Sequence, residues 1–144
     1  MKKRIIILRQ FLLLLEAVQT QISFINTDLF SLFSYLSENK SLDELTFVNK
    51  CFESLSETDN FELLWTDCVN NFKSPLTKDD SAIILSFGTQ LGKSDTEGQI
   101  RNCQIHKCQI ENQITDAEEK YKKYGNLYLK LGVLSGFLIV IFLL

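Results

Sequence analysis

The sequence predicts an all-α protein: a six-helix antiparallel bundle whose last helix continues into a C-terminal transmembrane segment. The 144 residues include one proline and six glycines, so the chain is poor in turn-forming residues and favours long helices with short connections. Apolar side chains recur at steps of three and four along most of the chain, which is the period of an amphipathic helix. No run alternates apolar with polar residues and no Asn-Gly hairpin turn occurs, so no sheet is expected.

The composition favours one non-enzymatic domain. The net charge is −3, so the chain lacks the overall basic field of a nucleic-acid binder. No P-loop and no G-x-G-x-x-G occurs, and a single histidine excludes a two-histidine metal motif. Carboxylate pairs such as Glu118 and Glu119 lie beside lysines and are typical of a solvated helix face. We therefore expect no catalytic residue, cofactor or nucleic-acid partner.

The first helix is predicted from about Lys3 to Phe24. Its apolar residues surround most of the helix, as in a helix at the centre of a bundle, and a helix lying on a membrane surface is the alternative. The start resembles a signal peptide only briefly, because Arg9 and Gln10 interrupt the apolar run and no cleavage site follows. The stripe that faces the core is predicted to contain Ile5, Leu8, Leu12, Leu15, Val18, Ile22 and Ile25.

Two shorter helices are predicted next. Residues 26–28 form a turn with cap candidates, and the second helix runs from there to about Ser37. The third helix is predicted to open at Ser41, because Glu44 stands three residues later in the spacing of a capping box.

The fourth helix is predicted to open near Asp59 and to carry the only tryptophan, Trp65, which we interpret as a packing anchor rather than a ligand-stacking residue. The proline ends this helix. Thr77 caps the fifth helix, and Asp80 lies in its first turn, where the helix dipole favours negative charge. Gly88 allows a close approach between helices.

A tight joint leads to the last helix, and its residues are the predicted structural site. Gly92 is a C-cap candidate in the left-handed conformation, so Gly92→Val is expected to destabilise the domain. Ser94 and Glu97 have the spacing of a capping box, and Asp95 is a second cap candidate. Gln99 is the last residue of this predicted joint.

The last helix carries a heptad seam that is interrupted at Lys107. Such a seam packs within the bundle or, in the alternative function, belongs to a tail-anchored coiled-coil adaptor of the SNARE type. The seam residues are Ile100, Cys103, Ile110, Ile114, Ala117, Tyr121, Tyr124, Tyr128 and Leu131.

The sequence becomes predominantly apolar at its C-terminal end, as in a segment surrounded by lipid. This change divides the chain into a predicted bundle domain (1–125) and a predicted transmembrane helix (126–144). Residues 127–144 would form a helix ~27 Å long, close to the hydrocarbon thickness of a bilayer. Lysines precede this segment, so the bundle is expected to be cytosolic. Gly132 and Gly136 have the G-x-x-x-G spacing of a contact between membrane helices, including one between copies of the chain.

Cys103, His106 and Cys108 form a C-x2-H-x-C pattern. A structural zinc site usually needs four ligands, so we interpret these residues as buried cysteines and a surface histidine. A metal or thiol redox sensor is the alternative, which zinc analysis and thiol titration would test.

Two stretches, LGKSDTEGQI (91–100) and YLKLGVLSGFLIVIFLL (128–144), closely resemble the stage III sporulation protein AB family of endospore-forming bacteria. LRQFLLLLEAVQTQISF (8–24) is similar to the first cytosolic helix of the family. Family members usually begin with a membrane helix and a basic stretch, and here KKR (2–4) stands where the basic stretch would be.

The resemblance implies a scaffold in the mother-cell membrane around the forespore, within the complex that links the two cells. The family's helical domain is similar to the F-type platform proteins of type II secretion and type IV pilus systems, which engage a cytosolic secretion ATPase. The implied partners are therefore other stage III sporulation proteins, this ATPase and membrane lipid.

Overall fold

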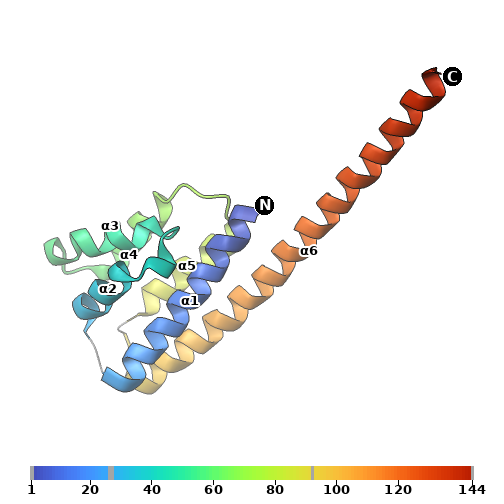
Figure 1. Ribbon diagram of the computed structural model, residues 1–144. Coiled ribbons are helices and arrows are strands. Elements are labelled where there is room, and N and C mark those ends of the chain that lie inside the picture. The colour runs from blue at the N-terminus through green and yellow to red at the C-terminus, as the bar shows by residue number, and fades with distance from the viewer. Residues whose placement is uncertain (1, 26–27, 92, 144) are drawn as a thin grey trace.

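Every regular element among the residues that the computed structural model describes is a helix, which confirms the predicted all-α class with six helices (Figure 1). The description covers the backbone of residues 2–25, 28–91 and 93–143 and the side chains of residues 2–23, 28–91 and 93–125. Within these ranges the chain forms six α-helices and two short 3₁₀ turns. The helices are α1 (Lys2–Ile25), α2 (Leu29–Glu38), α3 (Thr46–Ser54), α4 (Phe61–Asn70), α5 (Lys78–Gln90) and α6 (Thr96–Leu143), and the turns are η1 (Lys40–Leu42) and η2 (Leu55–Glu57).

Helix α1 is the central helix of the bundle and packs along the first part of α6. The two helices are antiparallel, because Arg9 pairs with Glu118 while Glu16 lies 3.3 Å from Lys107. One face of α1 is a buried stripe that consists of Leu8, Phe11, Leu14, Leu15 and Val18. By length and composition alone, Lys2–Ser23 could also cross a membrane (mean hydropathy 1.5), although 44% of that window is buried inside the bundle.

An aromatic cluster joins α2, α3, α4 and α5 around Trp65, which is fully buried. Its indole N–H donates to the carbonyl oxygen of Ile84 over 2.9 Å, so its one polar atom is satisfied. Gly88 lies directly against this ring: a β-carbon built there would be 2.1 Å from the indole. The predicted roles of Trp65 as an anchor and Gly88 as a close-approach residue are confirmed. The rings around Trp65 belong to Phe33, Phe47, Phe61 and Phe87.

The helix starts follow the predicted cap chemistry in part. The predicted cap at Thr77 is present at α5, and Asp80 returns a bond to the backbone of Thr77, so the two residues form a full capping box. The predicted box of Ser41 and Glu44 is wrong, because the chain makes the turn η1 there and α3 starts only at Thr46. The amide N–H of Glu44 donates instead to the side chain of Gln10 on α1, over 2.8 Å. A long-range bond to α1 thus replaces a local cap.

The heptad seam of α6 faces the bundle up to Ala117. Cys103 and Ile110 are fully buried and Ala117 is 2% exposed, whereas Tyr121 and Tyr124 are 47% and 46% exposed. The ribbon of α6 continues past the other helices as one helix to Leu143 (Figure 1). The tertiary contacts that bury the seam therefore end about where the predicted juxtamembrane region begins.

Candidate functional site

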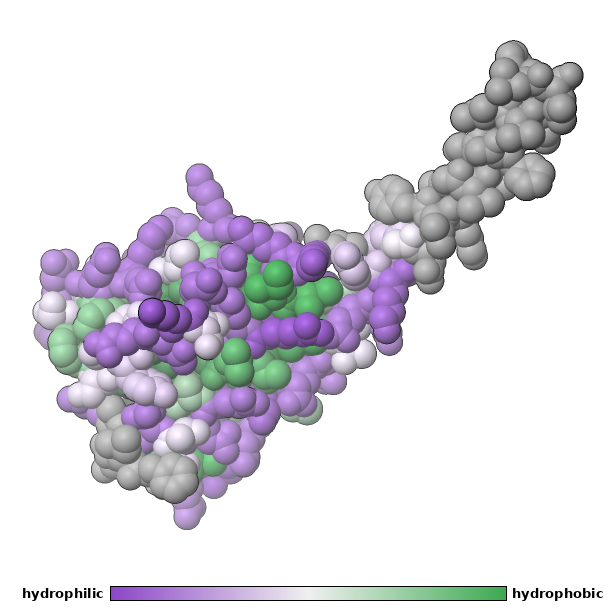
Figure 2. Space-filling model, in the orientation of Figure 1, coloured by the Kyte–Doolittle hydropathy of each residue, from purple (hydrophilic) through white to green (hydrophobic). Residues whose placement is uncertain are grey.

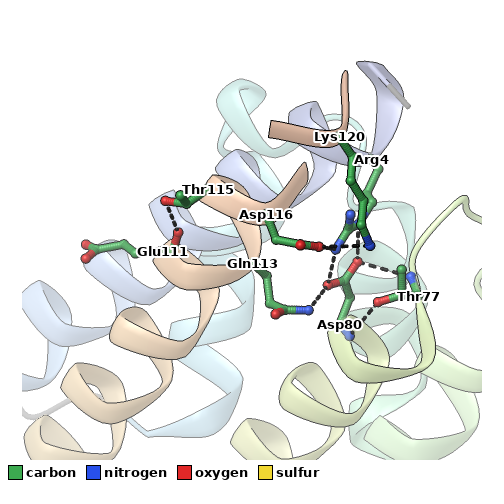
Figure 3. Close-up of polar contacts among 8 residues, drawn as sticks. All are labelled: Arg4, Thr77, Asp80, Glu111, Gln113, Thr115, Asp116 and Lys120. Atoms are coloured by element: carbon green, nitrogen blue, oxygen red, sulfur yellow. Dashed lines mark hydrogen bonds and ion pairs between the residues drawn. The ribbon is translucent and has the colours of Figure 1, made fainter. Parts of the chain in front are cut away.

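A buried ion pair connects the first helix of the bundle to the fifth. Arg4 of α1 is 6% exposed and Asp80 of α5 is fully buried. The guanidinium is bidentate: its Nε donates to Oδ2 of Asp80 over 2.7 Å and its Nη2 donates to Oδ1 over 3.1 Å (Figure 3). This geometry matches the two oxygens of a carboxylate and gives charge-assisted hydrogen bonds.

Further donors complete the environment of the Asp80 carboxylate. The amide N–H of Thr77 donates to Oδ2 over 3.1 Å, and Nε2 of Gln113 on α6 donates to Oδ1 over 2.7 Å (Figure 3). Burial by itself raises the pKa of Asp80, but the hydrogen bonds from Arg4, Thr77 and Gln113 outweigh burial and hold the pKa below its ordinary value. The pKa of Arg4 is raised, chiefly by its hydrogen bonds to Asp80. Both groups are therefore charged at neutral pH.

The network joins three helices and has the properties of a structural clamp. Asp116 of α6 lies 3.5 Å from Nη2 of Arg4 and 3.2 Å from Nζ of Lys120, which extends the network towards the surface (Figure 3). A carboxylate that accepts bonds from an arginine, an amide and a glutamine is not placed to take a proton from a substrate. We assign the network to holding α1, α5 and α6 in register.

Sequence reasoning placed Asp80 correctly in the first turn of α5 but explained it by the helix dipole, and it missed Arg4. Two signals were available. Arg4 opens the predicted core helix, and the carboxylate at the third position of the Thr77 capping box faces back along the helix start. Neither signal identifies the partner, because the two residues are 76 positions apart.

The joint before α6 is organised by Asp95 and Gln99. The side chain of Asp95 accepts a hydrogen bond from the amide N–H of Gly98 over 2.8 Å. The backbone carbonyl of Asp95 accepts one from the amide N–H of Gln99 over 2.9 Å. Asp95 thus occupies the cap position. Nε2 of Gln99 donates to Oγ of Ser94 over 3.0 Å and to the carbonyl oxygen of Gln90 over 3.3 Å, which ties the start of α6 to the end of α5.

The capping box predicted for Ser94 and Glu97 is therefore replaced by a cap at Asp95. The side chain of Glu97 is 85% exposed and lies 4.0 Å from Arg101, one helical turn further on. Ser94 takes part in the joint as an acceptor for a side chain rather than for a backbone N–H. Gly92 lies outside the described residues, so its predicted left-handed conformation stays a prediction.

A row of buried polar residues continues along α6 from Gln99. His106 is 3% exposed, so the predicted surface position of this histidine is wrong. Its Nδ1 donates to the carbonyl oxygen of Asn102 over 2.8 Å, and its Nε2 lies 3.2 Å from Oγ of Ser86. The imidazole of His106 packs on the ring of Phe87 in an edge-to-face arrangement, with a centroid distance of 5.6 Å. The seam therefore passes through His106 rather than being interrupted at Lys107.

The C-x2-H-x-C residues do not converge. Cys103 is fully buried, and burial raises the pKa of its thiol to about 11, whereas Cys108 is exposed. Among the residues that the structure describes, no group of three or more His, Cys, Asp or Glu side chains is placed to hold a metal ion. Gly132 and Gly136 belong to the ribbon of α6, and their surroundings lie outside the described side chains.

An open hollow of about 430 Å³ lies beside the joint, between the starts of α2 and α4 and the end of α5. At its rim, Nζ of Lys93 lies 2.6 Å from Oε2 of Glu62. The described residues that line the hollow offer no nucleophile next to a base, so the hollow gives no support for a catalytic site. They are Leu29, Asp59, Asn60, Phe61, Glu62, Gly88, Thr89, Leu91 and Lys93.

One comparison with known proteins gives a match. The model of the family described as stage III sporulation protein AB matches residues 1–144. No curated protein and no solved structure matches the chain.

Proposed function

The chain belongs to the stage III sporulation protein AB family, which gives it a sporulation-related role, and from this premise we propose that it is a non-enzymatic, platform-type scaffold of the membrane complex between mother cell and forespore. In this proposal residues 126–144 cross the mother-cell membrane around the forespore and the bundle (1–125) lies in the cytosol. The observation that carries the proposal is the continuity of α6, which forms one helix from the joint to Leu143.

A continuous helix makes the bundle and the proposed membrane segment a mechanical unit. Helix α1 packs along α6 up to Ala117, and the buried pair of Arg4 and Asp80 fixes α5 to both. A load on the bundle would therefore reach the membrane helix without a flexible linker. This coupling suits a scaffold better than an adaptor, because the seam that a SNARE-type adaptor needs free is buried within the bundle from Cys103 to Ala117, against α1 and α5.

Two arginine substitutions test which helix enters the membrane. Leu138→Arg places a charge near the middle of the proposed span, which costs about 3 kcal/mol for insertion. Leu13→Arg places the same charge on α1 at a side chain that is 45% exposed in the bundle. We expect Leu138→Arg to move the full-length protein out of the washed membrane fraction and Leu13→Arg to leave it there. Release by Leu13→Arg alone would instead identify α1 as the span.

We further propose that the bundle engages the cytosolic secretion ATPase of the same complex, together with other stage III sporulation proteins. The support is the resemblance of the family to F-type platform proteins. The test is a pull-down of the ATPase by the full chain in lipid nanodiscs, with empty nanodiscs as the control. Retention on loaded discs alone supports the engagement. No retention by a chain whose circular dichroism shows the folded helices would leave a scaffold that acts through its membrane helix.

Gly132 and Gly136 are the proposed contact face within the membrane, either for a second copy or for another membrane helix. Replacing both by leucine is expected to reduce chemical crosslinking of the full chain in nanodiscs. Unchanged crosslinking would exclude this face.

A further inference from the structure

The fold gathers lysines from three distant parts of the chain at one end of the bundle. Arg4 reaches both Asp80 and Asp116, which brings the start of α1 beside the start of α5 and residues 116–120 of α6. In Figure 1 the N-terminus and the α4–α5 connection lie at the end of the bundle where α6 leaves it. We call the exposed lysines of this region the lysine end: Lys2, Lys3, Lys73, Lys78, Lys120, Lys122 and Lys123.

The acidic residues near the lysine end are mostly engaged in ion pairs. Asp116 pairs with Arg4 and Lys120, and Glu118 pairs with Arg9. Glu44 lies 3.8 Å from Lys3. The exposed carboxylates that remain nearby include those of Asp43, Asp79 and Glu119. Lys3 and Lys120 are themselves the partners in these ion pairs, and the other five lysines of this end outnumber the three carboxylates, so the end is positively charged although the chain as a whole carries −3.

The opposite end of the bundle has the opposite character. Helices α2, α4 and α6 start there, so it carries exposed acidic residues that include Asp28, Asp59, Glu62, Asp95 and Glu97. Figure 2 shows hydrophilic side chains around hydrophobic patches near the middle of the visible face, and hydrophilic ones on the part of α6 that approaches the grey atoms. The bundle thus has a charge polarity along the axis of α6, with its positive end towards the proposed membrane segment.

The lysine end is close enough to the proposed membrane surface to sense its charge. Leu127, the first residue of the predominantly apolar stretch 127–144, lies seven positions after Lys120, which is roughly 10 Å along a helix. The Debye length at physiological ionic strength is ~8 Å, and a lysine side chain shortens the gap further. The lysines of α1 and of the α4–α5 connection lie at the same end of the bundle as Lys120, although they are distant from the proposed span in sequence.

We propose that the lysine end docks on the anionic phospholipid headgroups of the membrane that the C-terminal segment of α6 enters. The proposal rests on that segment being a membrane span. It goes further because the bundle itself becomes a lipid-binding element, held against the bilayer at a fixed orientation. Lys2, Lys3, Lys73 and Lys78 carry the new part of the surface, since a basic flank on α6 alone would accompany any membrane helix.

The test is lysine acylation of the full chain in nanodiscs of neutral phosphatidylcholine or of a mixture with phosphatidylglycerol, read by mass spectrometry at low salt. The negative potential at an anionic surface raises the ratio of protonated, unreactive amine to free amine roughly threefold, because protonation adds one elementary charge to the lysine. We expect Lys2, Lys73 and Lys78 to react roughly threefold more slowly in the anionic discs, and high salt to remove the difference. Lys93, at the opposite end, is the internal control and should react equally in both.

Charge-reversal variants separate docking from simple proximity. Lys2→Glu with Lys73→Glu should abolish the slowing at Lys78, whereas Lys40→Glu with Lys50→Glu, the same change elsewhere on the bundle, should preserve it. Equal rates in both lipids for a chain that co-purifies with the discs would overturn the docking and leave the membrane span intact. A chain that fails to co-purify with either disc would overturn the span and the docking with it.

Discussion

Asp80 shows at the scale of one residue how much a buried charge depends on its partners. Asp80→Asn keeps the size of the side chain but removes the bidentate countercharge of the Arg4 guanidinium, which leaves only the partly exposed carboxylate of Asp116 at 3.5 Å. Breaking such a pair costs about 3–5 kcal/mol, so we expect a loss of that order in the free energy of unfolding. Denaturant unfolding followed by the fluorescence of Trp65 measures it. Asp79→Asn is the matched control: Asp79 is the exposed neighbour, and its change should stay within about 0.5 kcal/mol.

The same pair gives the protein a predictable response to acid. The pKa of Asp80 is depressed in the folded state, so its contribution is present at neutral pH and is lost as pH falls below the unfolded value of ~3.9 and through the folded value. We expect the free energy of unfolding to fall on acidification in this window, with a smaller slope in Asp80→Asn. Equal slopes in the two proteins would show that other carboxylates dominate.

Gly88 is the second residue on which the packing depends. A β-carbon at this position would meet the Trp65 ring at 2.1 Å, a ring that is itself fixed by four aromatic neighbours and by its bond to Ile84. We expect Gly88→Ala to lower the melting temperature. Overpacking a core typically lowers the free energy of unfolding by about 1–3 kcal/mol. Gly125→Ala is the control, since a β-carbon there meets nothing within 4 Å. It should be neutral or stabilise α6 by up to about 1 kcal/mol. Similar losses in both variants would contradict the close-approach role.

At the scale of elements, the start of α6 depends on Asp95. Asp95→Ala removes the acceptor for the amide N–H of Gly98 and should cost about 1 kcal/mol, the usual value for a lost N-cap. Ser94→Ala removes a bond to the Gln99 side chain, which keeps its second acceptor at Gln90, so we expect a smaller loss. Denaturant midpoints of the two variants compare them directly. A larger loss for Ser94→Ala would restore the capping box that the sequence predicts.

Periodicity predicted the helices themselves well, because each must bury one apolar face whatever its neighbours are. The starts of helices were predicted where the cap is local, as for Thr77 and Asp80. They were missed where a distant residue competes, as when Gln10 takes the amide N–H of Glu44. The clamp of Arg4 with Asp80 and the burial of His106 depend on partners from other helices. Sequence spacing carries no information about such long-range partners.

At the scale of the whole molecule, α6 joins a part packed in the bundle, an exposed part and the apolar run that we propose spans the membrane, without a break in the helix. Its seam is buried against α1 up to Ala117, its side chains are exposed from residue 119 to residue 125, and its apolar run follows. Protection of helical amides from hydrogen exchange depends on how much free energy local opening requires, which packing raises. The three parts should therefore differ although all are helical.

Hydrogen exchange of the full chain in nanodiscs tests this arrangement. We expect slow exchange from residue 100 to residue 117, where α1 must detach before α6 opens, and fast exchange from residue 119 to residue 125. Slow exchange should return from residue 131 onward, because lipid excludes water and leaves the backbone no other partner. Fast exchange throughout residues 100–117 would free the seam and favour a coiled-coil adaptor. Slow exchange across residues 119–125 would mean that this stretch is covered, and dilution of the chain in the discs would then show whether a second copy covers it.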